Sequence, residues 1–286
     1  MTAPPILRYK AVVQYVGSAF AGWAKQRGNG PVTVQGVLEE ACNKISKGCS
    51  PNVYGAGRTD AGVHAIGQVF HFDLQRPSPL PAKNARDAVN FHIRALSYNN
   101  VLGILDVCHV PPTFHARFDA THREYVYRLV DGARTPVIFQ DDRAWVIPVR
   151  SPLCVRTMQE AAASVFSGER DFTSFTVVGG LEENMRKVRR IDYVQVQESS
   201  SLPPDHTARL AGGREITVRV KAQSFLYRQV RRIVGALVEC GQGRRSIQEL
   251  QNIRDLADPA QNPCNIAPAH GLYLFGVGYP AHLASP

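Results

Sequence analysis

Hydrophobic and polar positions recur along the chain at spacings typical of strands and helices. Tyr9–Tyr15 alternates between apolar and polar residues, and this alternation predicts a first strand. The segment Val34–Ile45 carries apolar residues at helical spacing, and Thr33 before it is suited to cap that helix. Further strands are expected around Val69–Leu74, Val101–Val110, Glu124–Asp131, Val188–Val196, Ile216–Lys221 and Gly271–Gly278, and further helices at Pro81–Leu96, Leu153–Phe166, Phe225–Val238 and Ile247–Leu256.

The order of these elements repeats, since strands and helices mix once before residue 112 and again after it. This repetition predicts an α+β fold of two comparable α/β halves around a mixed, mainly antiparallel sheet. We expect an N-terminal half at 1–112 and a C-terminal half at 113–286, joined near Pro111–Thr113. Glu198–Gly213 is rich in Ser, Pro and Gly, and it predicts a long loop between two strands.

The composition is that of a globular protein with a basic balance of charge. Of 286 residues, 44% are hydrophobic and 20% are charged, and the net charge is +9. A basic surface attracts polyanions such as nucleic acid, although it also aids solubility. Clustering favours the first interpretation. The clusters are Arg228, Arg231 and Arg232, and Arg186, Lys187, Arg189 and Arg190.

Six cysteines are spread over the chain, and no two of them form a Cys-x-x-Cys motif. This spacing predicts buried thiols in a reducing compartment and does not favour a metal site. No apolar run approaches the roughly 20 residues that a membrane span needs. The location within the cell, cytoplasmic or organellar, stays open.

The stretch YGAGRTDAGVHAIGQV (Tyr54–Val69) places Gly55, Gly57 and Gly62 around one arginine and one aspartate. Glycine is needed where the backbone takes a positive φ or another group comes very close, so we expect a tight loop that presents Arg58 and Asp60. The loop lacks the Gly-Lys-Ser/Thr of a phosphate-binding loop and does not match Gly-x-Gly-x-x-Gly. The charged pair is the next feature of the loop to consider.

Arg58 and Asp60 are two positions apart, so in an extended segment they face the same side. An aspartate with a pKa near ~3.9 is ionised at neutral pH and can act as a nucleophile or a base. A loop closed by an ordinary Arg–Asp ion pair is the alternative. Asp60 and His64 are too weak a pair to indicate a catalytic triad, and we expect a structural role for His64.

Four stretches of this chain resemble the motifs of one enzyme family, the TruA family of tRNA pseudouridine synthases. They occur in the family's order and spacing, so the resemblance covers nearly the whole chain. The stretches are GAGRTDAGVHAIGQVFHF, FHARFDATHREYVYRL (Phe114–Leu129), QSFLYRQVRRIVGALVECGQG (Gln223–Gly243) and APAHGLYLFGVGYP (Ala267–Pro280).

This resemblance implies an enzyme that isomerises uridine to pseudouridine in tRNA after flipping the base out of its stack. Asp60 matches the catalytic aspartate, and Arg58 matches the arginine beside the flipped nucleotide. Tyr125 matches the tyrosine that packs on the target base, and Arg231 matches the arginine that pairs with the aspartate. Leu272 is the expected apolar residue of the pocket.

The resemblance also implies the surroundings of the site. We expect the active site in a basic cleft between the halves, with Leu274 as the alternative to Leu272. The reaction needs neither a cofactor nor a metal. tRNA is the expected partner, a homodimer is possible, and no membrane is involved.

Other interpretations remain for the same residues. Tyr125, Tyr127 and Leu129 alternate as strand core does, Arg231 could be a solvated helix charge, and Phe20 and Trp23 could belong to the core or line an RNA groove. At the level of the protein, an RNA-binding protein without catalysis is one alternative, although the intact Arg58-Thr59-Asp60 argues against it. A glycoside or nucleoside hydrolase is another, but it would want a second positioned carboxylate, for which the sequence offers no clear candidate.

Overall fold

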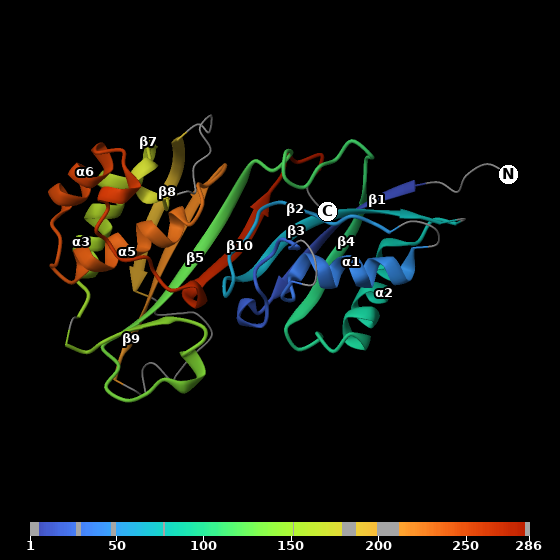
Figure 1. Cartoon of the computed structure of the whole chain (residues 1–286), viewed down its shortest axis with the longest axis horizontal. Coiled ribbons are helices and arrows are strands. Elements are labelled where there is room, and N and C mark those ends of the chain that lie inside the picture. Colours follow the sequence, from blue (N-terminus) through green and yellow to red (C-terminus); the bar gives the residue numbers. More distant parts are fainter. Residues whose placement is uncertain are drawn as a thin grey trace. The chain divides into compact units, whose positions relative to one another are not determined.

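The computed structural model describes residues 6–26, 30–46, 50–76, 78–150, 152–178, 187–198 and 212–283 (Figure 1). Three features singled out in the sequence lie outside these residues. They are Cys49, Arg186 and all but the ends of the expected loop Glu198–Gly213.

Strands and helices follow each other closely along the chain. The strands are β1 (Ile6–Tyr15), β2 (Tyr54–Gly55), β3 (His64–Gln75), β4 (Leu102–Val110), β5 (His122–Asp131), β6 (Trp145–Ile147), β7 (Gly168–Asp171), β8 (Val188–Glu198), β9 (Arg214–Ala222) and β10 (Leu272–Gly278). The helices are α1 (Val34–Ile45), α2 (Ala82–Ala95), α3 (Val155–Ala161), α5 (Gln229–Gly241) and α6 (Ile247–Asp255). The predicted α+β class, with a mixed and mainly antiparallel sheet, is confirmed.

The chain divides into two compact units. Unit 1 comprises Met1–Arg123 and Leu274–Pro286, and unit 2 comprises Glu124–Tyr273. The last strand of the chain thus returns mostly to the unit that contains the first. The domain boundary expected between residues 112 and 113 stays a prediction.

In unit 1 the strands follow the order β4-β1-β3-β10, and the short β2 pairs with β3. The pairs β1/β3, β1/β4 and β2/β3 are antiparallel. Helices α1 and α2 pack against each other, and α2 packs on β4 (Figure 1). The buried aromatic residues of this core are Tyr9, Phe70, Phe72 and Phe114.

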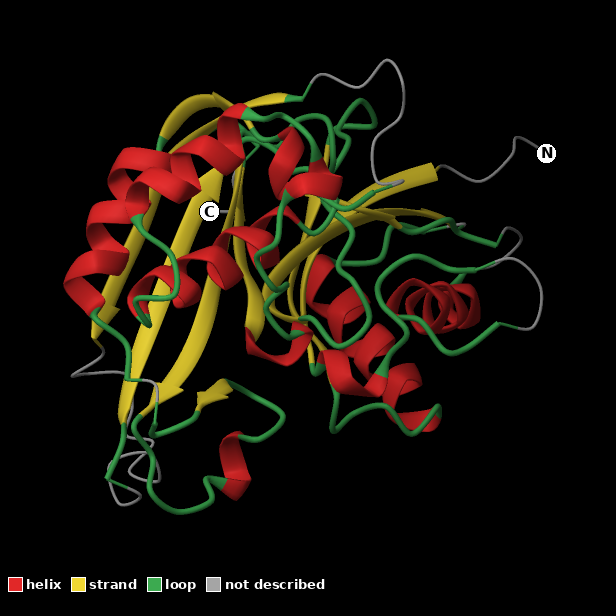
Figure 2. Ribbon diagram, turned by 60° about the vertical axis from the view of Figure 1, so that its left-hand side comes forward, coloured by secondary structure: helices red, strands yellow, loops and turns green. Residues whose placement is uncertain are grey.

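In unit 2 the strands follow the order β5-β9-β8-β7, and β6 runs parallel to β5. Strands β7 and β9 both pair antiparallel with β8. Helices α3, α5 and α6 gather on one face of these strands (Figures 1 and 2). Neither β6 nor β7 was expected from the sequence, because one has three residues and the other reads Gly-Glu-Arg-Asp.

Helix starts agree with the sequence where a capping side chain is present. The Thr33 hydroxyl accepts a hydrogen bond from the Gly36 N–H at the start of α1. The prediction that a helix begins at Phe225 is wrong, since α5 begins at Gln229. Arg228 just before it has a φ of +58°, in the left-handed region, and this interrupts the helical backbone.

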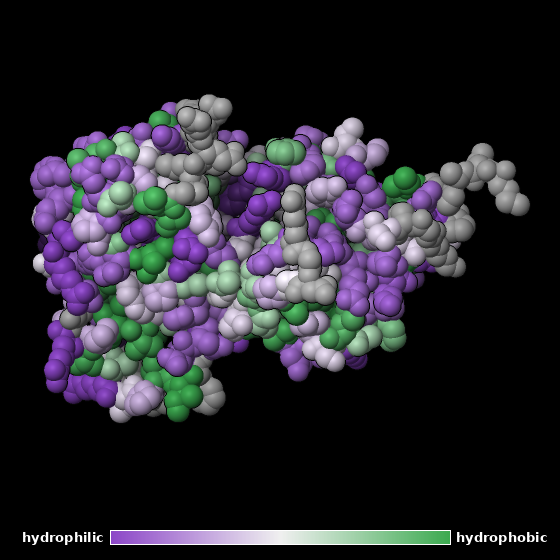
Figure 3. All heavy atoms as spheres, in the orientation of Figure 1, coloured by the Kyte–Doolittle hydropathy of each residue, from purple (hydrophilic) through white to green (hydrophobic). Residues whose placement is uncertain are grey.

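Hydrophilic side chains cover most of the face seen in Figure 3, with smaller hydrophobic patches between them. Two phenylalanines of unit 1 are strongly exposed, Phe118 at 74% and Phe91 at 66%. Within the described part of the chain, none of the helices has the length and apolar character that crossing a membrane requires.

Candidate active site

The glycine loop, which begins in β2 with Gly55 and continues through Gly57 and Gly62 towards β3, is shaped by two of these three glycines. An added Cβ on Gly55 would lie 2.5 Å from the Trp23 ring, so only glycine allows this close packing. Gly62 has a φ of +80° in the turn that the Val63 N–H closes on the Asp60 carbonyl. Gly57 meets neither condition, because a Cβ there would find open space.

Thr59 anchors this loop between the two charged residues. Its hydroxyl is hydrogen-bonded to the Tyr15 hydroxyl at 2.8 Å, and its carbonyl accepts from the Trp23 N–H at 3.0 Å. Thr59 is buried, whereas Arg58 is exposed and Asp60 is half-buried. The loop therefore directs its small polar residue inward and leaves both charged neighbours nearer the surface.

Arg123, in the second motif, supports the loop, although no feature of the sequence pattern distinguishes it. This buried side chain donates from Nη2 to the Ala56 carbonyl at 2.7 Å and to the Arg117 carbonyl at 2.6 Å. Ala56 also donates its N–H to the Val69 carbonyl. The segment before Asp60 is thus fixed to β3 and to the Phe114–Asp119 segment at once.

His64 has the structural role expected of it. Its side chain is buried, and Nδ1 accepts a hydrogen bond from the Gly17 N–H at 3.1 Å. Phe20 and Trp23 are also buried, and both pack near the Tyr15 ring. The structure therefore supports the core interpretation for these two aromatic residues.

Tyr125 lies on β5 in unit 2 and is 9% exposed. Its ring packs edge-to-face with Phe225 at a centroid distance of 5.3 Å. Tyr127, two positions along the same strand, is fully buried and donates its hydroxyl hydrogen to the Pro268 carbonyl. Burial raises the pKa of Tyr127, so this hydroxyl stays protonated.

Arg231 is not a solvated helix charge. It is half-buried on α5, and its Nε donates to the Ala267 carbonyl at 2.8 Å. The Ala267 N–H in turn donates to the Arg231 carbonyl. Arg232 behaves similarly and donates to the Cys264 carbonyl at 2.6 Å. The basic cluster at the start of α5 is therefore only partly a surface charge.

Residues 267–271, which begin with the Ala267 that binds Arg231, also contact the second motif. Tyr127 bonds to Pro268, and an added Cβ on Gly271 would lie 2.6 Å from the Tyr127 ring. Within unit 2 the structure thus brings together Arg231 and the Tyr125–Tyr127 strand around Ala267–Gly271. Asp60 and Arg58 belong to unit 1.

Leu272 and Leu274 are both buried on β10, at 5% and 0% exposure. Tyr273 between them donates its hydroxyl hydrogen to the Arg143 carbonyl. The choice between Leu272 and Leu274 as the apolar residue of the pocket stays a prediction.

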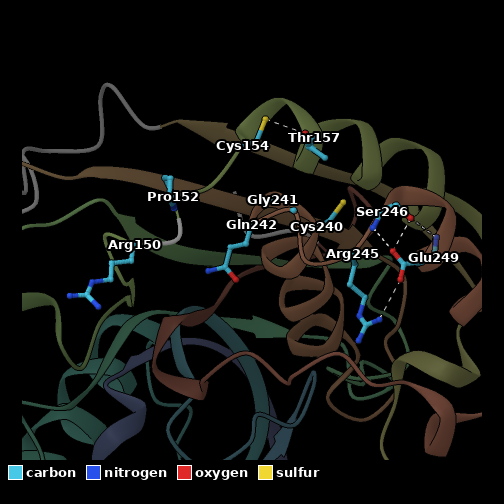
Figure 4. Close-up of a pocket in the computed structure, with 11 residues that line it drawn as sticks. Arg150, Pro152, Cys154, Thr157, Cys240, Gly241, Gln242, Arg245, Ser246 and Glu249 are labelled. Atoms are coloured by element: carbon cyan, nitrogen blue, oxygen red, sulfur yellow. Dashed lines mark hydrogen bonds and ion pairs between the residues drawn. The ribbon is translucent and has the colours of Figure 1, made fainter.

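A hollow of about 610 Å³ opens in unit 2 between the ends of α3, α5 and α6 (Figure 4). Two of its charged residues are paired with each other, since Arg245 contacts Glu249, and Arg245 also contacts Glu239. The Ser246 N–H at the start of α6 is bonded to Glu249 as well. None of the sequence-predicted site residues lines this hollow.

The cysteines are buried in part. Cys42, Cys240 and Cys264 are buried as expected, but Cys154 is exposed. A hydrogen bond from the Thr157 hydroxyl lowers the pKa of the Cys154 thiol. Among the described residues, no three His, Cys, Asp or Glu side chains gather as metal ligands would.

The family model described as tRNA pseudouridine synthase matches residues 11–119 and 162–280 of this chain. These ranges include the anchored Arg58-Thr59-Asp60 loop and the α5 arginines. The chain belongs to the tRNA pseudouridine synthase family, as the resemblance of its motifs predicts.

Individual relatives carry a more specific name. The chain is 38% identical to the tRNA pseudouridine synthase A of Maricaulis maris over 274 residues, which cover 96% of this chain and 98% of the relative. It is 41% identical to the protein of that name from Limosilactobacillus fermentum, over 95% of this chain and 96% of the relative. For the Beijerinckia indica protein of the same name the identity is 39%, over 96% and 94%.

Proposed function

We propose that this chain converts uridine to pseudouridine in tRNA, with Asp60 as the catalytic carboxylate. The observation that carries the proposal is the anchored loop, in which buried Thr59 fixes Arg58 and Asp60 on either side of it. The family supplies the reaction, and the names of the relatives supply tRNA as the substrate.

The reaction fits a site built from one carboxylate and neutral or cationic neighbours. The bond between N1 of uracil and C1′ of ribose breaks, the base turns, and a bond between C5 and C1′ forms as the C5 proton leaves. N1 ends with a proton, so atoms and electrons balance without a co-reactant. Asp60 can serve as the nucleophile or as the group that assists elimination.

The other residues take supporting roles in this proposal. Arg58 lies beside the flipped nucleotide, and the Tyr125 ring packs against the uracil. Arg231 pairs with Asp60 and keeps the carboxylate charged in a site shielded from water. Its own backbone and side chain are held by Ala267, which supports a fixed position. Leu272 lines the base pocket, with Leu274 as the alternative.

The proposal also covers the binding partners of this chain. tRNA is the substrate, and a measurement of molecular mass in solution tests whether two copies of the chain pair.

The test uses purified protein, an unmodified tRNA transcript and a metal chelator. We expect pseudouridine in the transcript without any added cofactor. Bound tRNA with no pseudouridine would favour the RNA-binding alternative. Free uracil in the supernatant, with an abasic site left in the transcript, would favour the hydrolase alternative.

A further inference from the structure

Four aromatic rings form a ladder on unit 1 that the proposed chemistry does not use. Tyr54 stacks on His71 with a centroid distance of 4.9 Å and an interplanar angle of 15°. His71 meets His115 at 4.8 Å, and His115 meets Phe118 at 4.3 Å. Hereafter these residues, Tyr54, His71, His115 and Phe118, are called the ring ladder.

Hydrogen bonds donated by backbone N–H groups of residues 115–117 hold the ring ladder in place. The Ala116 N–H donates to His71 Nδ1 at 3.1 Å, and the Arg117 N–H donates to His115 Nδ1 at 3.1 Å. The His115 N–H donates to Asp119 at 2.8 Å. Because these bonds fix the segment, a ligand that stacks on it would find its shape already formed.

The two ends of the ring ladder are open to solvent. Phe118 is 74% exposed and Tyr54 is 46% exposed, so both leave ring surface accessible to a ligand. The Arg117 guanidinium lies 5.8 Å from the centre of the Phe118 ring and is itself exposed. Aromatic faces beside an arginine match the chemistry of an unpaired nucleotide, since the base stacks and the phosphate is anionic.

The ring ladder adjoins the Asp60 loop. Tyr54 belongs to β2, six residues before Asp60, so their Cα atoms are at most about 21 Å apart. Arg123 links the two more directly, since it bonds both the Ala56 carbonyl of the loop and the Arg117 carbonyl beside Phe118. The ring ladder and Asp60 are therefore near enough in unit 1 for one tRNA to contact both.

We propose that the exposed Phe118 end of the ring ladder stacks an unpaired nucleobase of the tRNA, other than the uridine that reacts. This inference rests on the proposed function, because it takes tRNA as the ligand. Charge supports the same occupant, since the chain carries a net charge of +9 and Arg117 stands beside the ring.

The test measures the affinity of an unmodified tRNA transcript at one fixed salt concentration. All variants carry Asp60→Asn, so that binding is separated from turnover. Phe118→Ala should weaken binding about five- to a hundredfold, which corresponds to the loss of one stacked base. Phe118→Leu should weaken it nearly as much, because leucine keeps apolar area but has no ring face. Phe118→Trp should bind as well as the parent.

Phe91→Ala is the matched control, because Phe91 is also a phenylalanine of unit 1 and is 66% exposed. We expect it to leave the affinity unchanged. The Phe118→Trp variant adds a direct readout, since stacking on a base should quench the new indole fluorescence when tRNA binds, and a Phe91→Trp variant should show no such quenching.

Unchanged affinity in Phe118→Ala would overturn the inference. So would full affinity in Phe118→Leu, because apolar contact rather than stacking would then suffice. Either result leaves the proposed function standing if the wild-type enzyme, with Asp60 intact, forms pseudouridine. A wild-type enzyme that forms none would reject the proposed function instead.

Discussion

At the residue scale, the direction of Asp60 depends on its neighbour Thr59. The Thr59 hydroxyl bonds Tyr15 and its carbonyl bonds Trp23, so the backbone on both sides is fixed to β1 and to the segment before α1. The spacing of Arg58 and Asp60 predicts that both face one side. It cannot reveal the anchor, because Tyr15 and Trp23 are about 40 positions away.

Tyr125 offers the sharpest distinction between a stacking role and an acid–base role. Tyr125→Phe should be far milder than Tyr125→Ala if the ring is a platform for the flipped base. Stacking contributes about 1–3 kcal/mol per base, so the alanine variant should lose on the order of ten- to a hundredfold in single-turnover rate. The ring also packs on Phe225, so folding and tRNA binding must be measured separately.

Equal losses in the two Tyr125 variants would reject the platform role and make the hydroxyl a group in the chemistry. No loss in either would return Tyr125 to the core of β5, beside buried Tyr127.

Two other residue assignments show what the sequence alone could not settle. Arg231 and Arg232 look like surface charge in a basic run, yet both donate to backbone carbonyls of residues 264–267. Arg123 carries no signal in the pattern, although it joins the Asp60 loop to the Phe114–Asp119 segment. Apart from the local bond between Arg123 and Arg117, these contacts join residues 32 to 67 positions apart, and such pairings depend on the tertiary fold.

At the element scale, the glycine loop provides a matched pair of substitutions. Gly55→Ala should lower the melting temperature, because the new methyl group would overlap the buried Trp23 ring. Gly57→Ala should leave it nearly unchanged, since nothing lies within 4 Å of its added Cβ. Equal melting temperatures for the two variants, measured by thermal unfolding, would contradict the packing of Trp23 against β2.

The free energy of unfolding should depend on pH through His71, which pairs with Tyr54 where β2 meets β3. Burial, with the nearby charges of Arg8 and His115, lowers the pKa of His71 to about 4, while Asp73 and Asp119 oppose the shift. The unfolded chain has a pKa near ~6.5 at this residue, so it binds more protons than the folded chain between about pH 6.5 and pH 4. The free energy of unfolding should therefore fall as the pH falls through this window.

His71→Asn should reduce that loss, because asparagine does not titrate and can still accept from the Ala116 N–H. Urea unfolding at about pH 7 and about pH 5 measures the difference. His282→Asn is the control, since His282 is exposed. If the free energy of unfolding fell equally between the two pH values in wild type and in His71→Asn, His71 would not be the source of the pH dependence.

The elements themselves were predicted well where periodicity and capping agree. The helix at Val34–Ile45 was predicted with both its bounds and its cap, because Thr33 and the apolar spacing give the same boundary. The start of α5 was predicted four residues early, since the left-handed backbone of Arg228 leaves no mark in the apolar pattern. The helix expected at Leu153–Phe166 is α-helical only at Val155–Ala161 and widens to a π-helix at Ala162–Phe166.

At the scale of the whole molecule, the net charge of +9 predicts that tRNA affinity falls steeply with salt. Each neutralised phosphate should contribute roughly 0.7–0.9 log unit of affinity per tenfold change in salt. Lys187 and Arg190 are exposed beside or on β8, and replacing both with glutamine should flatten the slope. Arg156→Gln is the control, because Arg156 is paired with Glu160 on α3.

A tRNA titration against salt measures these slopes. Affinity that does not change with salt would contradict a basic RNA-binding surface. A slope unchanged by the double substitution would remove Lys187 and Arg190 from that surface.

The most direct measurement compares Asp60→Asn with wild type in single-turnover conversion of one tRNA transcript. The substitution keeps the shape of the side chain and removes its charge, so we predict no pseudouridine, with melting temperature and tRNA affinity largely unchanged. Asp106→Asn, an exposed position on β4, should retain the wild-type rate. Conversion by Asp60→Asn at a rate near that of wild type would contradict the assignment of Asp60 as the catalytic carboxylate.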